Sequence, residues 1–146
     1  MTYTAKAYYL PEHEDEPIEI DGTDDLRALI DAMLSQPRQT SVVVLYINER
    51  PLHEIGVPDH ELKIGVLADR KLGSARFVNG RDAVYASGHS DGVGPIRYQY
   101  MGHEDLFPAD SLAELDTLLG VANSFLEVGG SERPRGVEWL EWPKRQ

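Results

Sequence analysis

Cysteine is absent from this chain of 146 residues. Its absence excludes disulfides, thiol nucleophiles and cysteine-ligated zinc or redox sites, and it fits a reducing compartment. Long apolar runs are absent too: no stretch approaches the roughly 18 residues of a membrane-spanning segment, and the first residues lack a secretory signal pattern. We therefore expect a soluble, cytoplasmic protein that does not associate with membranes.

Positive charge is scarce. The chain has 14 Lys and Arg against 25 Asp and Glu, which gives a formal charge of −11 and a pI near 4.8. This charge repels the phosphates of nucleic acids, so direct nucleic acid binding is disfavoured. Residues 1–36 carry a net −7, residues 37–99 carry +1 and residues 100–146 carry −5, so the acid is concentrated at both ends.

The densest acidic run lies between residues 12 and 25 and is interrupted by Pro17. One interpretation is a solvated loop that leads into a helix, whose first turn favours acidic side chains. The other is a negative face presented to a basic partner, which would speed association. The run alone leaves both interpretations open.

Apolar periodicity predicts two helices. Residues 23–34 carry an apolar stripe with a 3.6-residue period, and Thr23 is suited to be the N-cap. A second stripe covers residues 112–126, with Asp110 or Ser111 as the cap and two glycines after its end.

Runs of β-branched and aromatic residues predict the strands. They cover residues 2–10, 17–20, 41–47, 61–68, 75–78, 83–87, 96–101 and 137–142. In residues 41–47, both the odd-numbered and the even-numbered positions are mainly apolar. Because alternate side chains of a strand point to opposite faces, this pattern favours a central strand that is covered on both faces. Because strands and helices do not alternate, we expect a single α+β domain over residues 1–146, with a mostly antiparallel sheet of about six or seven strands and two helices packed on one face.

The motifs of catalysis are weak. Residues 88–92 match the G-x-S-x-G elbow of α/β-hydrolases, but Ser90 is followed by a turn and a predicted strand, where an elbow requires a helix. His89 and His103 each precede an acid by two positions, yet no specific metal-ligand spacing is present, and phosphate-binding loops are absent. We predict no catalytic residue, metal or cofactor. A small hydrolase that uses Ser90, or a His/Asp metal site, is the enzymatic alternative.

Both tryptophans, Trp139 and Trp142, stand in the last predicted strand. We expect at least one of them to anchor the helices on the sheet, because an indole ring buries a large area. The other is available for an exposed edge or an interface.

The C-terminal segment carries a resemblance to a known family. Gly130, Arg133, Pro134, Val137 and Trp139 reproduce the G-x-x-R-P-x-x-V-x-W ending of a family of bacterial polymorphic-toxin immunity proteins, immunity protein family one. Softer similarities cover nearly the whole chain: the acidic first strand and loop, the capped helix at 23, SVVVLYI at 41–47, residues 59–66, Tyr98-x-Tyr100-x-Gly102-His103, Phe107-Pro108 and the helix that ends at Gly129.

The resemblance implies a non-enzymatic inhibitor. Members of this family are often encoded beside nucleic acid deaminase toxins, so the implied partner is the C-terminal domain of a cognate toxin, with a cytosine deaminase as the implied chemistry and blockage of its active site as the mechanism. An acidic protein suits this role, because enzymes that act on nucleic acid have basic substrate grooves. Immunity to a nuclease toxin and an acidic adaptor with an unknown partner are the alternatives.

Charge and loop placement suggest the contact residues. We hypothesise that the toxin is contacted by seven acids: Glu12, Glu14, Asp15, Glu16, Asp91, Glu104 and Asp105. The residues that match the family ending are interpreted as structural: Arg133, Pro134, Val137, Glu138 and Trp139. Arg133 is expected to pair with an acid and so fix the final strand.

Overall fold

The computed structural model describes residues 3–50, 58–90, 92 and 94–143. Its elements follow in the order β1 (Ala5–Tyr8), the 3-10 helix η1 (Pro11–Glu14), β2 (Ile18–Ile20), α1 (Thr23–Met33), the 3-10 helix η2 (Arg38–Thr40), β3 (Val42–Ile47), β4 (Glu61–Leu67), β5 (Leu72–Val78), β6 (Ala83–Ala86), β7 (Ile96–Tyr100), β8 (His103–Phe107), β9 (Ala113–Glu114), α2 (Leu115–Val128) and β10 (Trp139–Glu141). No helix in this described part of the chain is long and apolar enough to cross a membrane.

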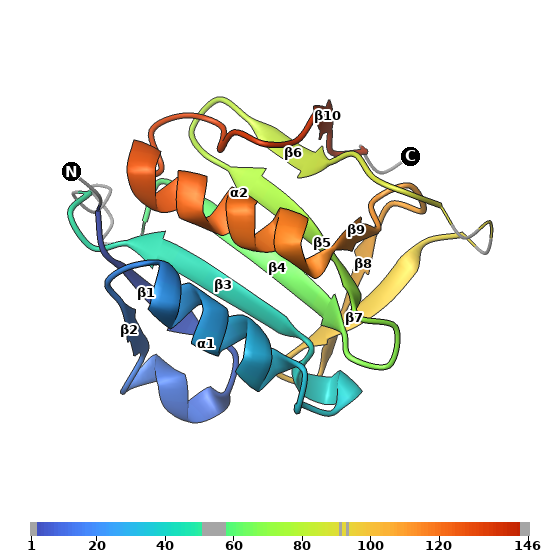
Figure 1. Ribbon diagram of the computed structural model, residues 1–146, viewed down its shortest axis with the longest axis horizontal. Coiled ribbons are helices and arrows are strands. Elements are labelled where there is room, and N and C mark those ends of the chain that lie inside the picture. The colour runs from blue at the N-terminus through green and yellow to red at the C-terminus, as the bar shows by residue number, and fades with distance from the viewer. Residues whose placement is uncertain (1–2, 51–57, 91, 93, 144–146) are drawn as a thin grey trace.

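The main sheet has the strand order β10-β6-β5-β4-β3-β1-β2, with the short β9 also paired to β5. Every pair in it is antiparallel. Helices α1 and α2 lie next to each other on one face of this sheet (Figure 1). The predicted α+β class is confirmed, and the main sheet has eight strands.

The larger core lies between the helices and the sheet. In α1 the predicted stripe is buried, from Leu26 to Met33, and in α2 the buried side includes Leu118 and Phe125. These side chains pack against alternate residues of the central strands, such as Leu45. Strand β3 lies between β1 and β4 and is buried along almost its whole length, as its unbroken apolar run predicts.

Two helix starts differ from the prediction. Thr23 is the first residue of α1 and not its cap; its hydroxyl instead donates to Asn123 of α2. Helix α2 starts at Leu115, because the backbone before it is extended and pairs with β5 as β9. Leu112 therefore does not belong to the α2 stripe but packs into a second apolar cluster on the other face of the sheet.

A separate two-stranded hairpin, β7–β8, builds this second cluster. The prediction placed residues 96–101 in a run of sheet strands and assigned no strand to 103–107; both segments instead leave the main sheet and pack against its other face. Gly65 makes the approach possible, because a Cβ there would lie only 2.6 Å from the Tyr98 ring. The buried hydroxyls of Tyr98 and Ser111 both bond to Ser74, at 2.8 and 2.9 Å.

Candidate functional site

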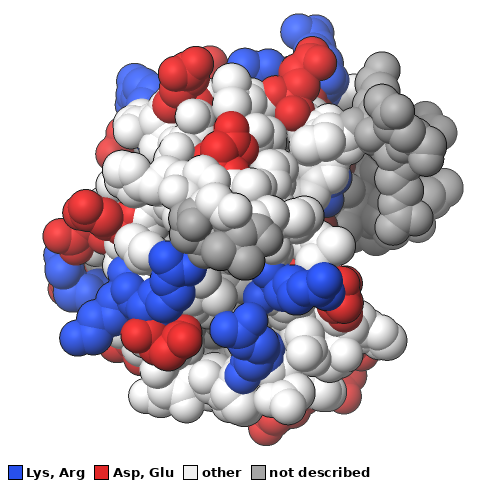
Figure 2. All heavy atoms as spheres, turned by 90° about the vertical axis from the view of Figure 1, so that its right-hand side faces the viewer, with Lys and Arg blue, Asp and Glu red and all other residues white. Residues whose placement is uncertain are grey.

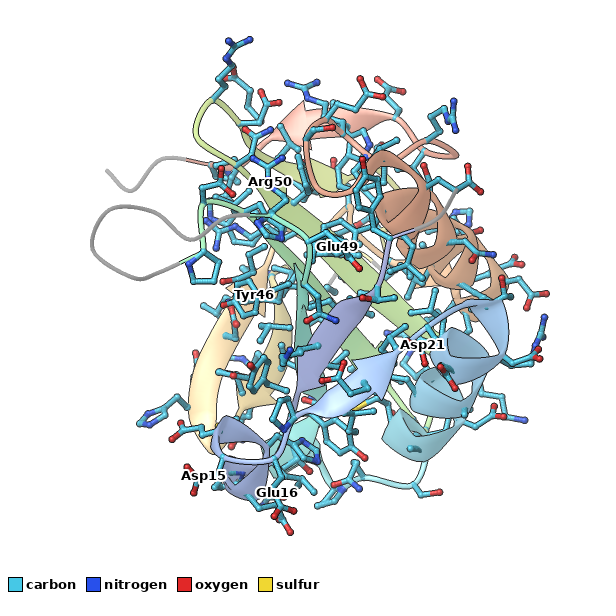
Figure 3. All side chains as sticks on the ribbon, turned by 90° about the vertical axis from the view of Figure 1, so that its left-hand side faces the viewer. Asp15, Glu16, Asp21, Tyr46, Glu49 and Arg50 are labelled. Carbon is cyan, nitrogen blue, oxygen red and sulfur yellow. The ribbon has the colours of Figure 1, made fainter. Side chains whose placement is uncertain are left out.

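The β7–β8 hairpin covers only part of the sheet face that is opposite the helices. Beside it, Tyr8 of β1 and Tyr46 of β3 occupy strand positions that point away from the helices, and both side chains are half-buried. Their rings meet edge to face, 5.9 Å apart. Figure 3 views the molecule from the β1–β2 edge, with the helices on the right and the hairpin on the left, and Tyr46 lies between the hairpin and β1. We call Tyr8, Tyr46, Tyr100 and Glu61 the open face.

A carboxylate lies among the tyrosines of the open face. Glu61 comes from β4, and its Oε2 accepts a hydrogen bond of 2.9 Å from the Tyr46 hydroxyl. Burial, followed by the charge of Glu61, raises the pKa of Tyr46 well above its usual value. Burial also raises the pKa of Tyr100 to about 12, with further contributions from Glu61, Glu14 and Tyr8. The Tyr46 and Tyr100 hydroxyls therefore remain protonated near neutral pH.

A hollow of about 310 Å³ adjoins the open face. Its lining comprises Lys6, Tyr8, Tyr46, Ile47, Asn48, Arg50, Pro58 and His60. Lys6 pairs with Glu19 at 3.4 Å and also donates to Asn48 at 2.8 Å. The ammonium group of Lys6 at the edge of this hollow therefore already has two polar partners.

At the back of the hollow, Arg50, Asp59 and His60 form a chain of hydrogen bonds. Arg50 binds Asp59 with two nitrogens, at 2.9 and 2.5 Å, and Asp59 contacts His60 Nδ1 at 3.0 Å. The backbone N–H of Ile47 donates to His60 Nε2 at 2.7 Å, so Nδ1 carries the proton. Burial lowers the pKa of His60. Because Nε2 already accepts a backbone hydrogen bond, this histidine is not placed to take a proton from a substrate, and the chain ties β3 to the segment before β4.

The acidic turn at η1 has an internal support. The buried His13 accepts hydrogen bonds at Nδ1 from the backbone N–H groups of Tyr9 and Leu10, at 3.1 and 3.0 Å. Burial lowers the pKa of His13, which favours its neutral, accepting form. Around it, the predicted contact residues of this turn are all exposed: Glu12, Glu14, Asp15 and Glu16. Figure 3 shows Asp15 and Glu16 below Tyr46, and Glu49 and Arg50 above it.

The two predicted acids of β8 point in opposite directions. Asp105 faces the main sheet, where its carboxylate pairs with Lys63 at 2.8 Å and is mostly buried. Glu104 faces outward and pairs with Arg97 at 3.2 Å, with both side chains more than half exposed. Asp105 therefore borders the open face with its charge already matched, whereas Glu104 lies on the outer side of the hairpin. Asp91 lies outside the described residues.

The family-ending residues lie at the far edge of the main sheet, near β10 and β6 (Figure 1). Arg133 forms the expected ion pair, with Asp82 at 2.9 Å. The Trp139 indole packs on Phe77 and donates to the Pro134 carbonyl at 2.7 Å. Val137 packs against the larger core, and Glu138 is exposed, with its backbone carbonyl accepting from Ser87. Trp142 instead packs on Phe107 in the second cluster, so each tryptophan serves a different face.

Lys and Arg side chains are concentrated at the end of the molecule formed by η2, the β4–β5 turn and the start of β7 (Figure 2). Figure 2 shows Lys and Arg side chains across the middle of this end, intermixed with a few acidic ones. Arg38, Arg70 and Arg97 line a hollow of about 260 Å³ there. The charge of −11 is therefore distributed unevenly in space, and the open face and the acidic turn belong to a different side.

The enzymatic alternatives are a His/Asp metal site and a hydrolase that uses Ser90. Among the described residues, no group of three or more His, Asp and Glu side chains is arranged to hold a metal ion. Ser90 lies in a loop, where its hydroxyl accepts from the Gly92 N–H at 3.1 Å, and the next element is the strand β7.

Sequence reasoning missed the tyrosines and Glu61 as a group. A signal was present, because Tyr46 is the one amphipathic side chain in the otherwise apolar run 42–47. Its meeting with Glu61 and Tyr100 depends on strand pairing between distant segments, which the sequence alone does not give.

Comparison with known proteins connects the fold to a family. No protein of curated function matched the chain. The sequence model for the immunity protein Imm1 matches residues 14–141, which includes the acidic turn from Glu14 onward, the open-face residues of β3, β4 and β7, and the C-terminal edge. The match covers most of the chain, and the chain therefore belongs to the Imm1 family of immunity proteins.

Proposed function

We propose that this protein neutralises the C-terminal domain of a cognate toxin that acts on nucleic acid, a cytosine deaminase in the most specific form of the proposal, by covering its active site. The role is one of binding without catalysis, in the cytoplasm of the cell that makes the toxin. Membership of the immunity protein family supports a toxin as the partner. The deaminase chemistry rests on the resemblance and on charge.

One observation carries the proposal: four exposed carboxylates at the acidic turn border a half-buried, tyrosine-rich face. Among the described residues none of these four has an ion-pair partner, so their charge is available to a partner. A nucleic acid enzyme must attract phosphates and therefore presents basic groups around its active site. Carboxylates can occupy the positions of those phosphates, and tyrosine rings provide rigid contact area.

The test begins with co-purification of the protein and the toxin domain encoded immediately upstream, followed by a rescue assay in cells that express this toxin. We expect a 1:1 complex and restored growth. DNA recovered from unprotected cells identifies the chemistry: cytosine-to-uracil changes indicate a deaminase, and strand breaks indicate a nuclease. Absence of both binding and rescue would overturn the proposal.

The role of the acidic turn is tested by charge reversal of Glu14, Asp15 and Glu16 to Lys. We expect the association rate constant at low salt to fall about tenfold or more, with a smaller change in the dissociation rate, because exposed charges act mainly on encounter. The matched control reverses Glu132, Glu138 and Glu141, which are also exposed acids and lie at the β10 edge. An equal effect of both triple variants would show that net charge, and not this turn, governs association.

A further inference from the structure

We propose that the open face is an anchor site that receives one cationic side chain, an arginine or a lysine, of the bound toxin. This inference rests on the proposed function, because it assigns a chemical group of the toxin to a specific place on this protein. Tyr8, Tyr46 and Tyr100 supply the rings and Glu61 supplies the negative charge.

The first argument is geometric. The three tyrosines come from β1, β3 and β7 and therefore from both sheets, and Glu61 comes from β4, which pairs with β3. The contact between the Tyr8 and Tyr46 rings and the bond from Tyr46 to Glu61 restrict these side chains before any partner arrives. Tyr8, Tyr46 and Tyr100 are each only partly buried, so part of each residue remains accessible. A preorganised aromatic site loses little side-chain entropy on binding.

The second argument is the balance of charge. Lys63 forms its short ion pair with Asp105, at 2.8 Å, and lies 3.9 Å from Glu61. Lys6 is held by Glu19 and Asn48, and Arg50 is held by Asp59. Lys6 and Arg50 are thus matched by other groups, and Lys63 lies closer to Asp105 than to Glu61. Glu61 therefore has one long ion pair, with Lys63, and one hydrogen bond among the described residues, from the Tyr46 hydroxyl. An additional cation is favoured here, and an additional anion is not.

The third argument is the chemistry of the occupant. Aromatic faces attract cations within about 6 Å of the ring centre, and the attraction is stronger when the site is desolvated. An apolar side chain would bury Glu61 without compensation, which is costly. A phosphate group would meet a carboxylate and the negative faces of the rings. A guanidinium or ammonium group satisfies both the rings and the carboxylate, and a toxin that binds nucleic acid has such groups at its active site.

The experiment measures toxin binding kinetics for the wild-type protein, Glu61→Gln, Tyr46→Leu and Tyr46→Phe, with Glu132→Gln as the control for loss of one exposed acid. We expect Glu61→Gln and Tyr46→Leu to raise the dissociation rate constant at least tenfold, with the association rate constant changed less than twofold. Tyr46→Phe keeps the ring, and we expect a rise of about threefold. Glu132→Gln should leave both constants unchanged.

The outcomes separate the two proposals. If the wild-type protein does not bind the toxin, the proposed function fails. If it binds and the Glu61 and Tyr46 variants, folded by their thermal unfolding curves, dissociate like wild type, the anchor site is overturned and the immunity role stands. Should Tyr46→Leu not fold, hydroxyl-radical footprinting of the wild-type complex replaces it: protection of Tyr8, Tyr46 and Tyr100 supports the anchor, and unchanged oxidation of all three overturns it.

Discussion

The two faces of the main sheet are covered in different ways. On one face, α1 and α2 enclose a continuous apolar core that extends across the sheet from β2 to β6. On the other, the β7–β8 hairpin covers a small cluster of buried residues, namely Val42, Leu67, Ile96, Tyr98, Phe107 and Leu112. The remainder of that face carries the tyrosines and Glu61. We infer that the helix face provides most of the stability, which allows the other face to keep polar and aromatic groups for a partner.

The chemistry of the contacts also differs between the faces. The helix side is held mainly by aliphatic and aromatic packing, as between Phe77 and Phe125. The hairpin side combines packing with polar contacts, such as the buried hydrogen bond between the Tyr98 and Ser74 hydroxyls and the partly buried ion pair of Lys63 with Asp105. Polar contacts fix geometry but contribute less net stability than buried apolar area. The hairpin should therefore open at a lower free energy than the helices.

The largest effect is expected from Phe125→Ala in α2. Phe125 is fully buried between Phe77 and His60, and its loss leaves a large cavity, so we expect the free energy of unfolding to fall by about 3 to 5 kcal/mol. The comparison variant is Phe107→Ala in the hairpin cluster, where a smaller loss is expected because the hairpin can relax. Urea unfolding measures both. A larger loss for Phe107→Ala would reverse the proposed ranking of the two faces.

The close approach of the hairpin is tested by Gly65→Ala. The added methyl group would lie 2.6 to 2.8 Å from three ring atoms of Tyr98, so the hairpin must move away. We expect a loss of about 1 to 3 kcal/mol, typical of overpacking. Hydrogen exchange should show faster exchange in residues 96–107 and little change in α1 and α2. Uniform acceleration across the chain would mean that the two faces unfold as one unit.

How much of this the sequence could predict depends on the range of the interactions. The α1 stripe and the central strand β3 follow from local periodicity, and both are confirmed. The β8 strand was missed because His103, Glu104 and Asp105 are typical of a turn, and they form a strand only through pairing with β7. Similarly, composition identified the acidic turn, but the register that joins Tyr46 to Glu61 connects segments that are distant in sequence and was not accessible.

A pH-dependent contribution is expected from the hydrogen-bonded chain behind the open face. The bond from Arg50, against the effect of burial, lowers the pKa of Asp59 to about 2, from 3.8. A carboxyl with a depressed folded pKa stabilises the fold above its unfolded pKa, and this contribution is lost as the pH falls from about 4 toward 2. Burial lowers the pKa of His60, so the unfolded state binds a proton first and stability already declines as the pH falls below about 6.5.

The measurement is urea unfolding of the wild-type protein and Asp59→Asn between pH 7 and pH 2. Because the Asp59 side chain is about one-third exposed, we expect its part of the pH dependence to be only about 1 kcal/mol after solvent screening. The difference between the two proteins should shrink as the pH falls below 4. A difference that stays constant over this range would show that the Asp59 charge does not stabilise the fold.

The smallest effect is expected from Arg133→Ala at the edge farthest from the open face. The Arg133 and Asp82 side chains form a two-point ion pair, at 3.2 and 2.9 Å, but they are 44% and 27% exposed. Exposed pairs contribute little, so the free energy of unfolding should fall by less than about 1 kcal/mol, and the difference should diminish in high salt. Since Arg133 joins the segment after α2 to the turn before β6, its loss should leave toxin binding within twofold of wild type. A tenfold loss of affinity with stability retained would instead place the family ending in the toxin interface, and would make the far edge, and not only the open face, part of the binding surface.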